Sequence, residues 1–237
     1  GFAIAEAFSK LGAQTILEYK EEIALKESVA KLGVGHKYFP IDVTHSDAAN
    51  QAMLAAINNF GGLDILISNA GAAHAGPMLG ISNEELRTAF ELNFFSHYSF
   101  STEAAKILKD QNRGGQILFN ISKQAVNPGK NFGAYGLPKA TTFFLMRQLA
   151  LELGSDGIRV NGINADRIRS GLLTDDFISS RAKSRGVSES EYMAGNLLNK
   201  EVTAEHVADA FTALACAEST TGHVMTVDGG NIEASLR

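Results

Sequence analysis

Two side chains that could carry acid–base chemistry stand four positions apart in the stretch GAYGLPKATTFFLMRQLALELG, residues 133 to 154. Side chains at i and i+4 share one face of a helix, so Tyr135 and Lys139 can point into the same space. A free phenol, with a pKa of about 10, is too weak an acid to exchange protons near neutral pH. At about 4 Å and an effective dielectric constant of about 20, an ammonium attracts a phenolate by roughly 4 kcal/mol, or up to about three pKa units. The pair therefore predicts a tyrosine tuned by its lysine.

Such a pair also arises by chance, so its interpretation depends on two further polar residues. Ser122 ends the stretch GGQILFNIS, thirteen residues before Tyr135, and its hydroxyl can hydrogen-bond a substrate oxygen as charge develops there. The alternative is a strand-end serine that satisfies a loop amide. Asn93 interrupts an apolar helical pattern although asparagine is a poor helix former. It is either functional or an ordinary buried amide bonded to nearby backbone.

The length and composition favour a single globular α/β domain and argue against several classes of binding partner. The chain has 237 residues, 45% of them hydrophobic, and a net charge of -5 without basic clusters. This charge pattern predicts no binding to nucleic acid or to an anionic membrane. A single cysteine, Cys216, leaves no intramolecular disulfide, and no run of about 20 apolar residues is present. We expect a cytoplasmic protein, and the scattered histidines predict no metal site.

The elements that must position these residues alternate between strand-like and helical patterns. Strand-like stretches cover residues 13–19, 36–43, 63–71, 114–122, 157–165 and 222–230. Amphipathic helical patterns lie near 45–60, 83–110, 134–153 and 203–218. This rhythm predicts an α/β fold with a doubly wound, Rossmann-like parallel sheet and helices on both faces. Most of the strand-like stretches end in Gly, Asn, Asp or Ser, at the sheet edge where such folds bind ligands.

The beginning of the chain and one long segment need separate expectations. Residues 2–11 are helical in pattern and turn at Gly12 into a strand, with no strand before them. We expect that the first strand and most of a glycine-rich turn are missing. Gly1 then either contributes to phosphate binding or is only the N-cap of the helix. Residues 1–237 are predicted to form one domain, with the irregular segment 166–200 as a substrate lid.

The chain resembles the short-chain dehydrogenase/reductase family over its whole length. The resemblance is carried by the order and spacing of SNAG (68–71), Asn93, Ser122, YGLPK (135–139), IRVNGI (158–163) and VDGG (227–230). It implies hydride transfer between a nicotinamide and an alcohol/carbonyl pair. More narrowly, FNISKQAVNPG, AGNLLNKEVTAEHVADAF and TTGHVMTVDGGNIEASLR resemble the dehydrogenase half of bifunctional proteins that join a rhamnulose-1-phosphate aldolase-like domain to a lactaldehyde or alcohol dehydrogenase.

The resemblance also implies a role for each residue of the site. Tyr135 is the acid/base, Ser122 polarises the substrate, and Lys139 both tunes the tyrosine and holds the nicotinamide ribose hydroxyls. Asn93 distorts its helix and anchors a water that relays protons to the lysine. The family often has two serines at the strand end, the second of them catalytic, whereas here Lys123 follows Ser122. Spacing favours Ser122, while motif alignment leaves a neighbouring group as the alternative.

The same resemblance implies a set of cofactor-binding residues. Asp42 ends a strand where its carboxylate can accept from the adenine amino group, with Val43 against the ring. The other implied contacts are Gly1 at the pyrophosphate, Asn69, Ala70 and Gly71 beside the adenosine, Asn161 and Ile163 leading to the nicotinamide, and Ser170 at its carboxamide. The family's usual Pro-Gly is Ala165-Asp166 here, which predicts a different backbone path before Ser170.

The choice between NAD and NADP depends on which residue stands at the end of the strand that is second in the family's fold. An acidic residue there binds the ribose hydroxyls and repels a 2′-phosphate. That position is Tyr19 in this chain, between Glu18 and Lys20. Glu18 favours NAD if it turns inward and Lys20 favours NADP. NAD is expected because the narrower relatives use it, and NADP is not excluded.

We therefore predict an NAD(H)-dependent oxidoreductase of a small hydroxyl or carbonyl compound, lactaldehyde- or 1,2-propanediol-like or sugar-derived. Apolar positions left uncovered on helices 83–110 and 134–153 predict a homodimer or homotetramer. The narrower resemblance implies an aldolase-like domain, either fused to this chain or associated with it. One rival is a silent nucleotide-binding oligomerisation module, supported by Tyr19, Lys123 and Ala165-Asp166. The other is an epimerase that uses the nicotinamide transiently.

Overall fold

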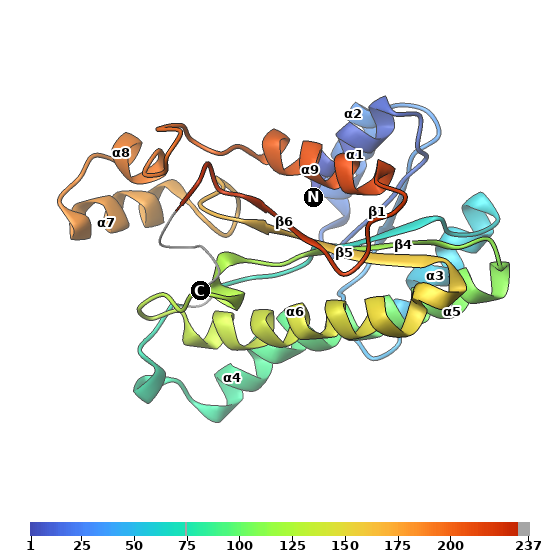
Figure 1. The fold of residues 1–237 in the computed structure, drawn as a ribbon, viewed down its shortest axis with the longest axis horizontal. Coiled ribbons are helices and arrows are strands. Elements are labelled where there is room, and N and C mark those ends of the chain that lie inside the picture. Colours follow the sequence, from blue (N-terminus) through green and yellow to red (C-terminus); the bar gives the residue numbers. More distant parts are fainter. Residues whose placement is uncertain (74, 232–237) are drawn as a thin grey trace.

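The protein is described by a computed structural model over residues 1–73 and 75–231, and its core is a parallel sheet between two layers of helices (Figure 1). All strand pairs in this part of the chain are parallel. The strands are β1 (Ile16–Tyr19), β2 (Lys37–Pro40), β3 (Ile65–Ser68), β4 (Gly115–Asn120), β5 (Ile158–Ala165) and β6 (Val224–Val227). This arrangement confirms the predicted Rossmann-like α/β fold.

The helices lie on both faces of the sheet. They are α1 (Phe2–Lys10), α2 (Glu22–Leu32), α3 (Ala48–Phe60), α4 (Asn83–Phe90), α5 (Ser96–Gln111), α6 (Gly133–Leu153), α7 (Asp175–Arg185), α8 (Glu189–Met193) and α9 (Ala204–Cys216). In Figure 1, α5 and α6 cover the lower face and α4 lies below α6, α1 and α9 cover the upper face, and α7 and α8 lie beyond the carboxyl ends of β5 and β6.

The strands form two hydrogen-bonded groups instead of the single sheet that was expected. One has the order β1-β2 and the other the order β3-β4-β5-β6. Within the described residues, no strand pairs with both β1 and β3. The four-stranded group carries the residues singled out for chemistry, because β3, β4 and β5 lead directly into them.

Alternate residues of β4 face opposite sides of the sheet, and both sides are buried. Ile117 and Phe119 pack with Leu108 of α5 in one cluster, whereas Leu118 packs with Phe211 of α9 in the other. A strand buried on both faces is typical of a parallel sheet covered by helices. Ser122 lies two residues beyond the end of this buried strand.

The sequence patterns missed two parts of the helical structure. α2 was not predicted, because it is rich in charge and only Leu25 is buried. The segment 166–200 was expected to be irregular but contains α7 and α8, whose N-caps Thr174 and Ser188 accept backbone hydrogen bonds in the first turn. Such short helices depend on caps and local packing more than on an apolar stripe.

The close approach of α6 to β5 at Gly162 gives a test of this packing. A Cβ at Gly162 would lie 2.9 Å from Ile121 Cγ1 and from Met146 Sδ. Gly162→Val should therefore overpack the core and lower the free energy of unfolding by about 1–3 kcal/mol. Urea denaturation should show a lower midpoint with an unchanged slope.

Gly154→Ala is the matched control for this variant. Gly154 has helical angles (φ −59°, ψ −38°), and a Cβ there would meet no heavy atom within 4 Å. The alanine should leave stability unchanged or raise it by about 0.4–1 kcal/mol. Equal urea midpoints for the valine variant and the wild type would contradict the described α6–β5 packing.

Candidate active site

The structure brings Ser122 and Tyr135 together. Ser122 follows β4 directly, and Tyr135 lies in the first turn of α6. Both side chains are buried, and their hydroxyl groups are hydrogen-bonded to each other. Ser122 Oγ also accepts a hydrogen bond from the Gln124 backbone N–H at 3.2 Å, so it satisfies a loop amide as well. The two interpretations of Ser122 are therefore compatible, and the serine beside the tyrosine is Ser122 rather than a neighbour.

Lys139 is buried one turn further along α6, with 2% of its surface exposed. Its Nζ donates to the Asn120 carbonyl oxygen at 2.9 Å and lies 6.0 Å from the centroid of the Tyr135 ring. Burial lowers the pKa of Lys139 to about 7, because the charged ammonium is cut off from water. Near neutral pH, Lys139 is thus poised between its charged and neutral forms.

The expected lowering of the Tyr135 pKa by Lys139 is absent from this structure. Burial raises the pKa of Tyr135 above its usual value, and only the hydrogen bond from Ser122 acts in the opposite direction. The physical reason is that the ammonium bonds to Asn120 instead of the phenol and is itself desolvated. Helical spacing correctly predicts that Tyr135 and Lys139 share a face, but it does not predict the distance between them or the charge state of Lys139.

Asn93 lies in a π-helical segment, Glu91–Phe95, between α4 and α5. The predicted distortion of the helix is confirmed. Its Nδ2 donates to the carbonyl oxygens of Ala72 at 2.9 Å and Ala89 at 3.1 Å, and its own carbonyl accepts from Thr142 Oγ1 at 2.7 Å. The side chain therefore bonds to backbone, as the plainer alternative held, while it clamps the loop after β3 to α4.

His97 is a residue of this site that the sequence reasoning missed. It is buried with 1% exposure, its Nδ1 lies 2.6 Å from Ser68 Oγ, and its Nε2 lies 3.4 Å from Lys139 Nζ. The available signal was a histidine four residues after Asn93 in a largely apolar pattern. The spacing pointed to one helix face but could not show that α6 places Lys139 against it.

Several expected cofactor-binding residues converge beside this cluster. Gly1 caps the start of α1 next to Asn69, and a Cβ on Gly1 would lie 3.4 Å from Asn69 Nδ2. Asn69 Oδ1 accepts from Asn120 Nδ2 at 2.9 Å. A Cβ on Gly71 would lie 2.9 Å from Asn93 Oδ1 and 3.6 Å from Lys139 Nζ. A larger residue at Gly71 would therefore displace the Asn93 side chain.

Residues at the ends of β1 and β2 form the outer part of this region. Asp42 accepts hydrogen bonds from the backbone N–H of Thr44 at 3.0 Å and from its hydroxyl at 2.7 Å, which lower the pKa of the carboxyl. Val43 is partly buried against the core. Glu18 is half-buried, and desolvation raises its pKa to about 7, whereas Tyr19 is exposed.

Three expected nicotinamide contacts have structural partners instead. Ile163 is fully buried in the cluster with Phe211, so its side chain has no surface for a cofactor. Asn161 donates to the Thr220 carbonyl at 2.8 Å and thereby ties β5 to the loop before β6. Ser170 Oγ donates to the Ile168 carbonyl at 3.2 Å and caps its own turn. A contact of Ile163 with the cofactor therefore remains a prediction that only its backbone can meet, because β5 turns the side chain into the core.

The two departures from the family pattern near the site contact each other. Lys123 Nζ forms an ion pair with Asp166, a carboxylate with only 5% side-chain exposure. The same carboxylate accepts from Asn231 Nδ2 at 2.5 Å and lies 3.3 Å from Arg167 Nε. A buried charge is stable only with such partners, so Lys123 and Asp166 form one unit that joins the ends of β4, β5 and β6.

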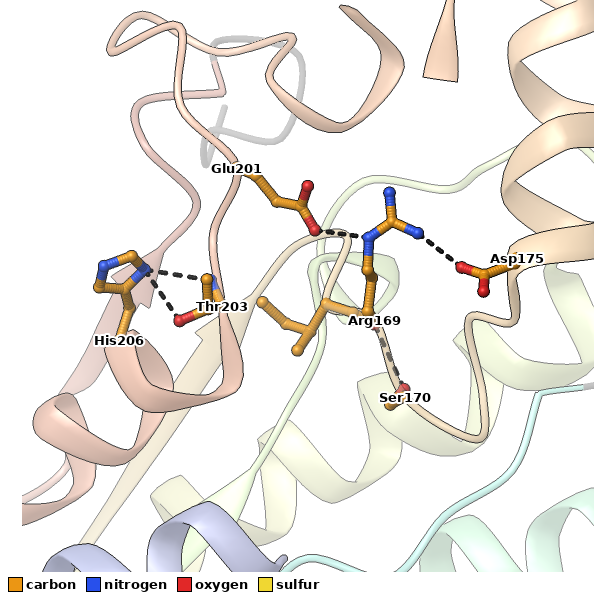
Figure 2. A network of polar contacts seen from close by, with 7 residues as sticks. Arg169, Ser170, Asp175, Glu201, Thr203 and His206 are labelled. Atoms are coloured by element: carbon orange, nitrogen blue, oxygen red, sulfur yellow. Dashed lines mark hydrogen bonds and ion pairs between the residues drawn. The ribbon is translucent and has the colours of Figure 1, made fainter. Parts of the chain in front are cut away.

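Arg169 holds the two ends of the segment 166–200 (Figure 2). Its guanidinium binds Asp175 at 2.6 Å, at the start of α7, and Glu201 at 2.8 Å, just before α9. A cavity of about 380 Å³ lies between this segment and the chain after β6, lined by Arg167, Arg185, Tyr192, Asn196, Leu197 and Asn231 among others. The segment thus covers the carboxyl edge of the sheet.

No group of three or more His, Cys, Asp or Glu side chains among the described residues could hold a metal ion. No helix of these residues is both long and apolar enough to cross a membrane.

Comparison with known proteins relates the whole chain to oxidoreductases. The family profile described as Enoyl-(Acyl carrier protein) reductase matches residues 1–231. The oxidoreductase YuxG of Bacillus subtilis (strain 168) is 35% identical over 198 residues, which are 80% of this chain but 29% of that protein. Glucose 1-dehydrogenase of Gluconobacter oxydans (strain 621H) is 28% identical over 236 residues, which are 97% of this chain and 86% of the relative.

Solved structures of other proteins have the same fold as this chain. A 3-ketoacyl-(acyl-carrier-protein) reductase from Brucella melitensis, complexed with NADH, superposes with a TM-score of 0.88 at 23% identity over 97% of this chain and 93% of its own. At that identity the likeness supports the fold alone. The match of the family profile to nearly the whole chain, on this fold, shows that the chain belongs to the short-chain dehydrogenase/reductase family, within its enoyl-(acyl carrier protein) reductase-like group.

Proposed function

We propose that the protein transfers a hydride between NAD(H) and a small alcohol or carbonyl compound. The observation that carries the proposal is the buried hydrogen bond between Ser122 and Tyr135 beside the buried amine of Lys139. A structural role needs neither a desolvated phenol nor a desolvated lysine, both of which destabilise the fold. Groups with strongly shifted pKa values in one cluster are typical of catalytic sites.

The chain's own residues divide the work of this reaction. Ser122 donates its hydroxyl hydrogen to the substrate oxygen, and Tyr135 exchanges a proton with that same oxygen. Lys139, when charged, stabilises the phenolate, and this charge lowers the Tyr135 pKa in a way that the structure lacks. Lys139 also holds the nicotinamide ribose. The nicotinamide supplies the hydride acceptor or donor. Gly1, Asn69, Ala70 and Gly71 would hold the rest of the cofactor at the edge of the sheet.

We infer NAD as the cofactor from the end of β1. Glu18 precedes the exposed Tyr19, and its half-buried carboxyl group could bond a ribose hydroxyl and disfavour a 2′-phosphate. Lys20 is exposed and is the residue that would favour NADP. Asp42 is held in its ionised form by Thr44, as an acceptor for the adenine amino group would be.

The substrate that we propose is a small hydroxyl or carbonyl compound, lactaldehyde-like or sugar-derived. The name of one similar protein, glucose 1-dehydrogenase, supports a sugar-derived substrate. Segment 166–200 would act as the lid over it. The match to YuxG covers less than a third of that protein, which supports a longer polypeptide; the fused or associated aldolase-like domain rests on the sequence resemblance alone.

We also propose that the protein is a homodimer or homotetramer. The outer faces of α5 and α6 expose large apolar side chains, among them Tyr98, Phe144 at 67% and Leu151 at 80% exposure. Such neighbouring apolar groups are typical of surfaces covered by another subunit. A monomer in sedimentation equilibrium would contradict this proposal.

The silent oligomerisation module loses part of its support. Lys123 and the Ala165-Asp166 turn were counted as damage to an ancestral site, yet they satisfy each other in a buried ion pair. The tyrosine, serine and lysine remain together although a scaffold would not need them. We therefore keep the oxidoreductase as the proposed function.

Removing the phenol hydroxyl tests the acid/base role. Tyr135→Phe should bind NAD(H) with wild-type affinity and lose at least about a hundredfold in turnover, because general acid–base catalysis contributes about that much. Turnover is followed by nicotinamide absorbance with a panel of small alcohols and aldehydes. The control Tyr38→Phe alters a tyrosine of β2 and should turn over normally. Near wild-type turnover of Tyr135→Phe would exclude the proposed role.

Cofactor preference is tested by thermal unfolding with each nicotinamide nucleotide. A ligand at a hundred times its dissociation constant stabilises the folded state by about 2.7 kcal/mol. NAD(H) should raise the unfolding temperature more than NADP(H) at equal concentration, and Glu18→Gln should reduce that difference. Equal or greater stabilisation by NADP(H) would overturn the assignment of NAD.

A further inference from the structure

His97 is a fully buried titratable group that the proposed reaction has not used. It lies on α5 with its ring enclosed by β3, β4 and α6. Ser68 Oγ lies 2.6 Å from Nδ1, Lys139 Nζ lies 3.4 Å from Nε2, and the Phe119 ring is 6.1 Å away between centroids. Of the described groups that contact this imidazole, only Lys139 can carry a charge.

The surroundings of His97 keep it neutral. Burial holds the pKa of His97 well below its usual range, and the positive charge of Lys139 lowers it further. A hydrogen bond with the Ala70 backbone acts in the opposite direction but is the weakest of the three causes. A neutral imidazole has one N–H donor and one acceptor nitrogen.

The charged form of Lys139 selects one tautomer of this imidazole. An ammonium has only donors, so the nitrogen facing it, Nε2, must be the acceptor. The proton then sits on Nδ1, which lies 2.6 Å from Ser68 Oγ. Lys139 thus has two acceptors on the protein, the Asn120 carbonyl and His97, which leaves its third N–H for a ligand.

The Asn93 side chain is not a hydrogen-bond acceptor for Lys139. Its side chain bonds to the backbone of Ala72 and Ala89, and its carbonyl accepts from Thr142. Among the described residues, His97 is the side chain within hydrogen-bond distance of Lys139 Nζ.

We propose that His97 is a positioning residue for the oxidoreductase reaction, with Nε2 accepting a hydrogen bond from Lys139 and holding its ammonium beside the Tyr135 ring, where the proposed function requires a positive charge. This inference rests on the proposed function for its catalytic consequence but not for the contact itself. Ser68 takes part as the hydrogen-bond partner of the other ring nitrogen, Nδ1.

The direction of the effect follows from the charges. Without the acceptor, the buried ammonium is less stable and Lys139 loses its proton at lower pH. Tyr135 then lacks a neighbouring positive charge and keeps its own proton to higher pH. For alcohol oxidation, which needs the phenolate, the rising limb of the pH–rate profile must therefore move to higher pH.

Two substitutions separate the hydrogen bond from the packing. His97→Gln can place Oε1 near the position of Nε2 and keep the acceptor, whereas His97→Leu removes it. The leucine variant should shift the rising limb by about one to two pH units to higher pH, as expected for losing a hydrogen bond to a charged group. In the glutamine variant, the rising limb should move by less than about half of that shift. Ser101→Ala, a buried polar change on the same helix, is the control and should not shift it.

A second readout does not depend on turnover. The 13Cε signal of Lys139, assigned with Lys139→Met, should titrate with a midpoint of about 7 in the wild type and at lower pH in His97→Leu. If His97→Leu does not fold, Ser68→Ala should show a smaller shift in the same direction. Equal lysine midpoints in the wild type and the folded variant would overturn the inference. A shifted lysine midpoint without turnover in any variant would instead contradict the proposed function alone.

Discussion

The burial of one amine, Lys139, is the constraint on which the rest of the site depends. An ammonium without water is expensive unless protein groups accept its hydrogen bonds. The structure provides these acceptors from separate elements, a carbonyl at the end of β4 and an imidazole on α5. The positions of β4, α5 and α6 relative to one another are therefore as important as the lysine itself. Together they leave the pKa of Lys139 at about 7, where a ligand can decide its charge.

The same reasoning explains why the departures from the family pattern are not defects. Lys123 stands where a second serine is common, and its charge would be unfavourable beside Ser122 if it were unpaired. Asp166 supplies the partner from the end of β5, and Asn231 joins them after β6. Three strand ends are thus tied together by one buried carboxylate. We infer that replacing Asp166 would leave Lys123 and Arg167 without their shared carboxylate, whereas replacing Lys123 would leave Asp166 with Arg167 and Asn231.

The sequence predicted most of what depends on local pattern and less of what depends on contact. The strands, the long helices and the shared face of Tyr135 and Lys139 follow from periodicity, and Asn93 marked the π-helical turn because it is a poor helix former. The burial of the Ile163 side chain was not predicted, since alternation along β5 was not used to decide which face it takes. His97 and the ion pair of Lys123 with Asp166 could not be read from spacing, because each joins residues more than 40 positions apart.

The central claim is that a hydride moves between substrate and NAD(H) at the cluster of Ser122, Tyr135 and Lys139. In the most direct test, the protein is incubated with NAD⁺ and small alcohols that carry deuterium on the carbinol carbon. The mass of the NADH formed is then determined by mass spectrometry. The account predicts NADH that has gained one deuterium, in proportion to the carbonyl product. Carbonyl product without deuterium in NADH, or no NADH from any alcohol of the panel, would contradict it.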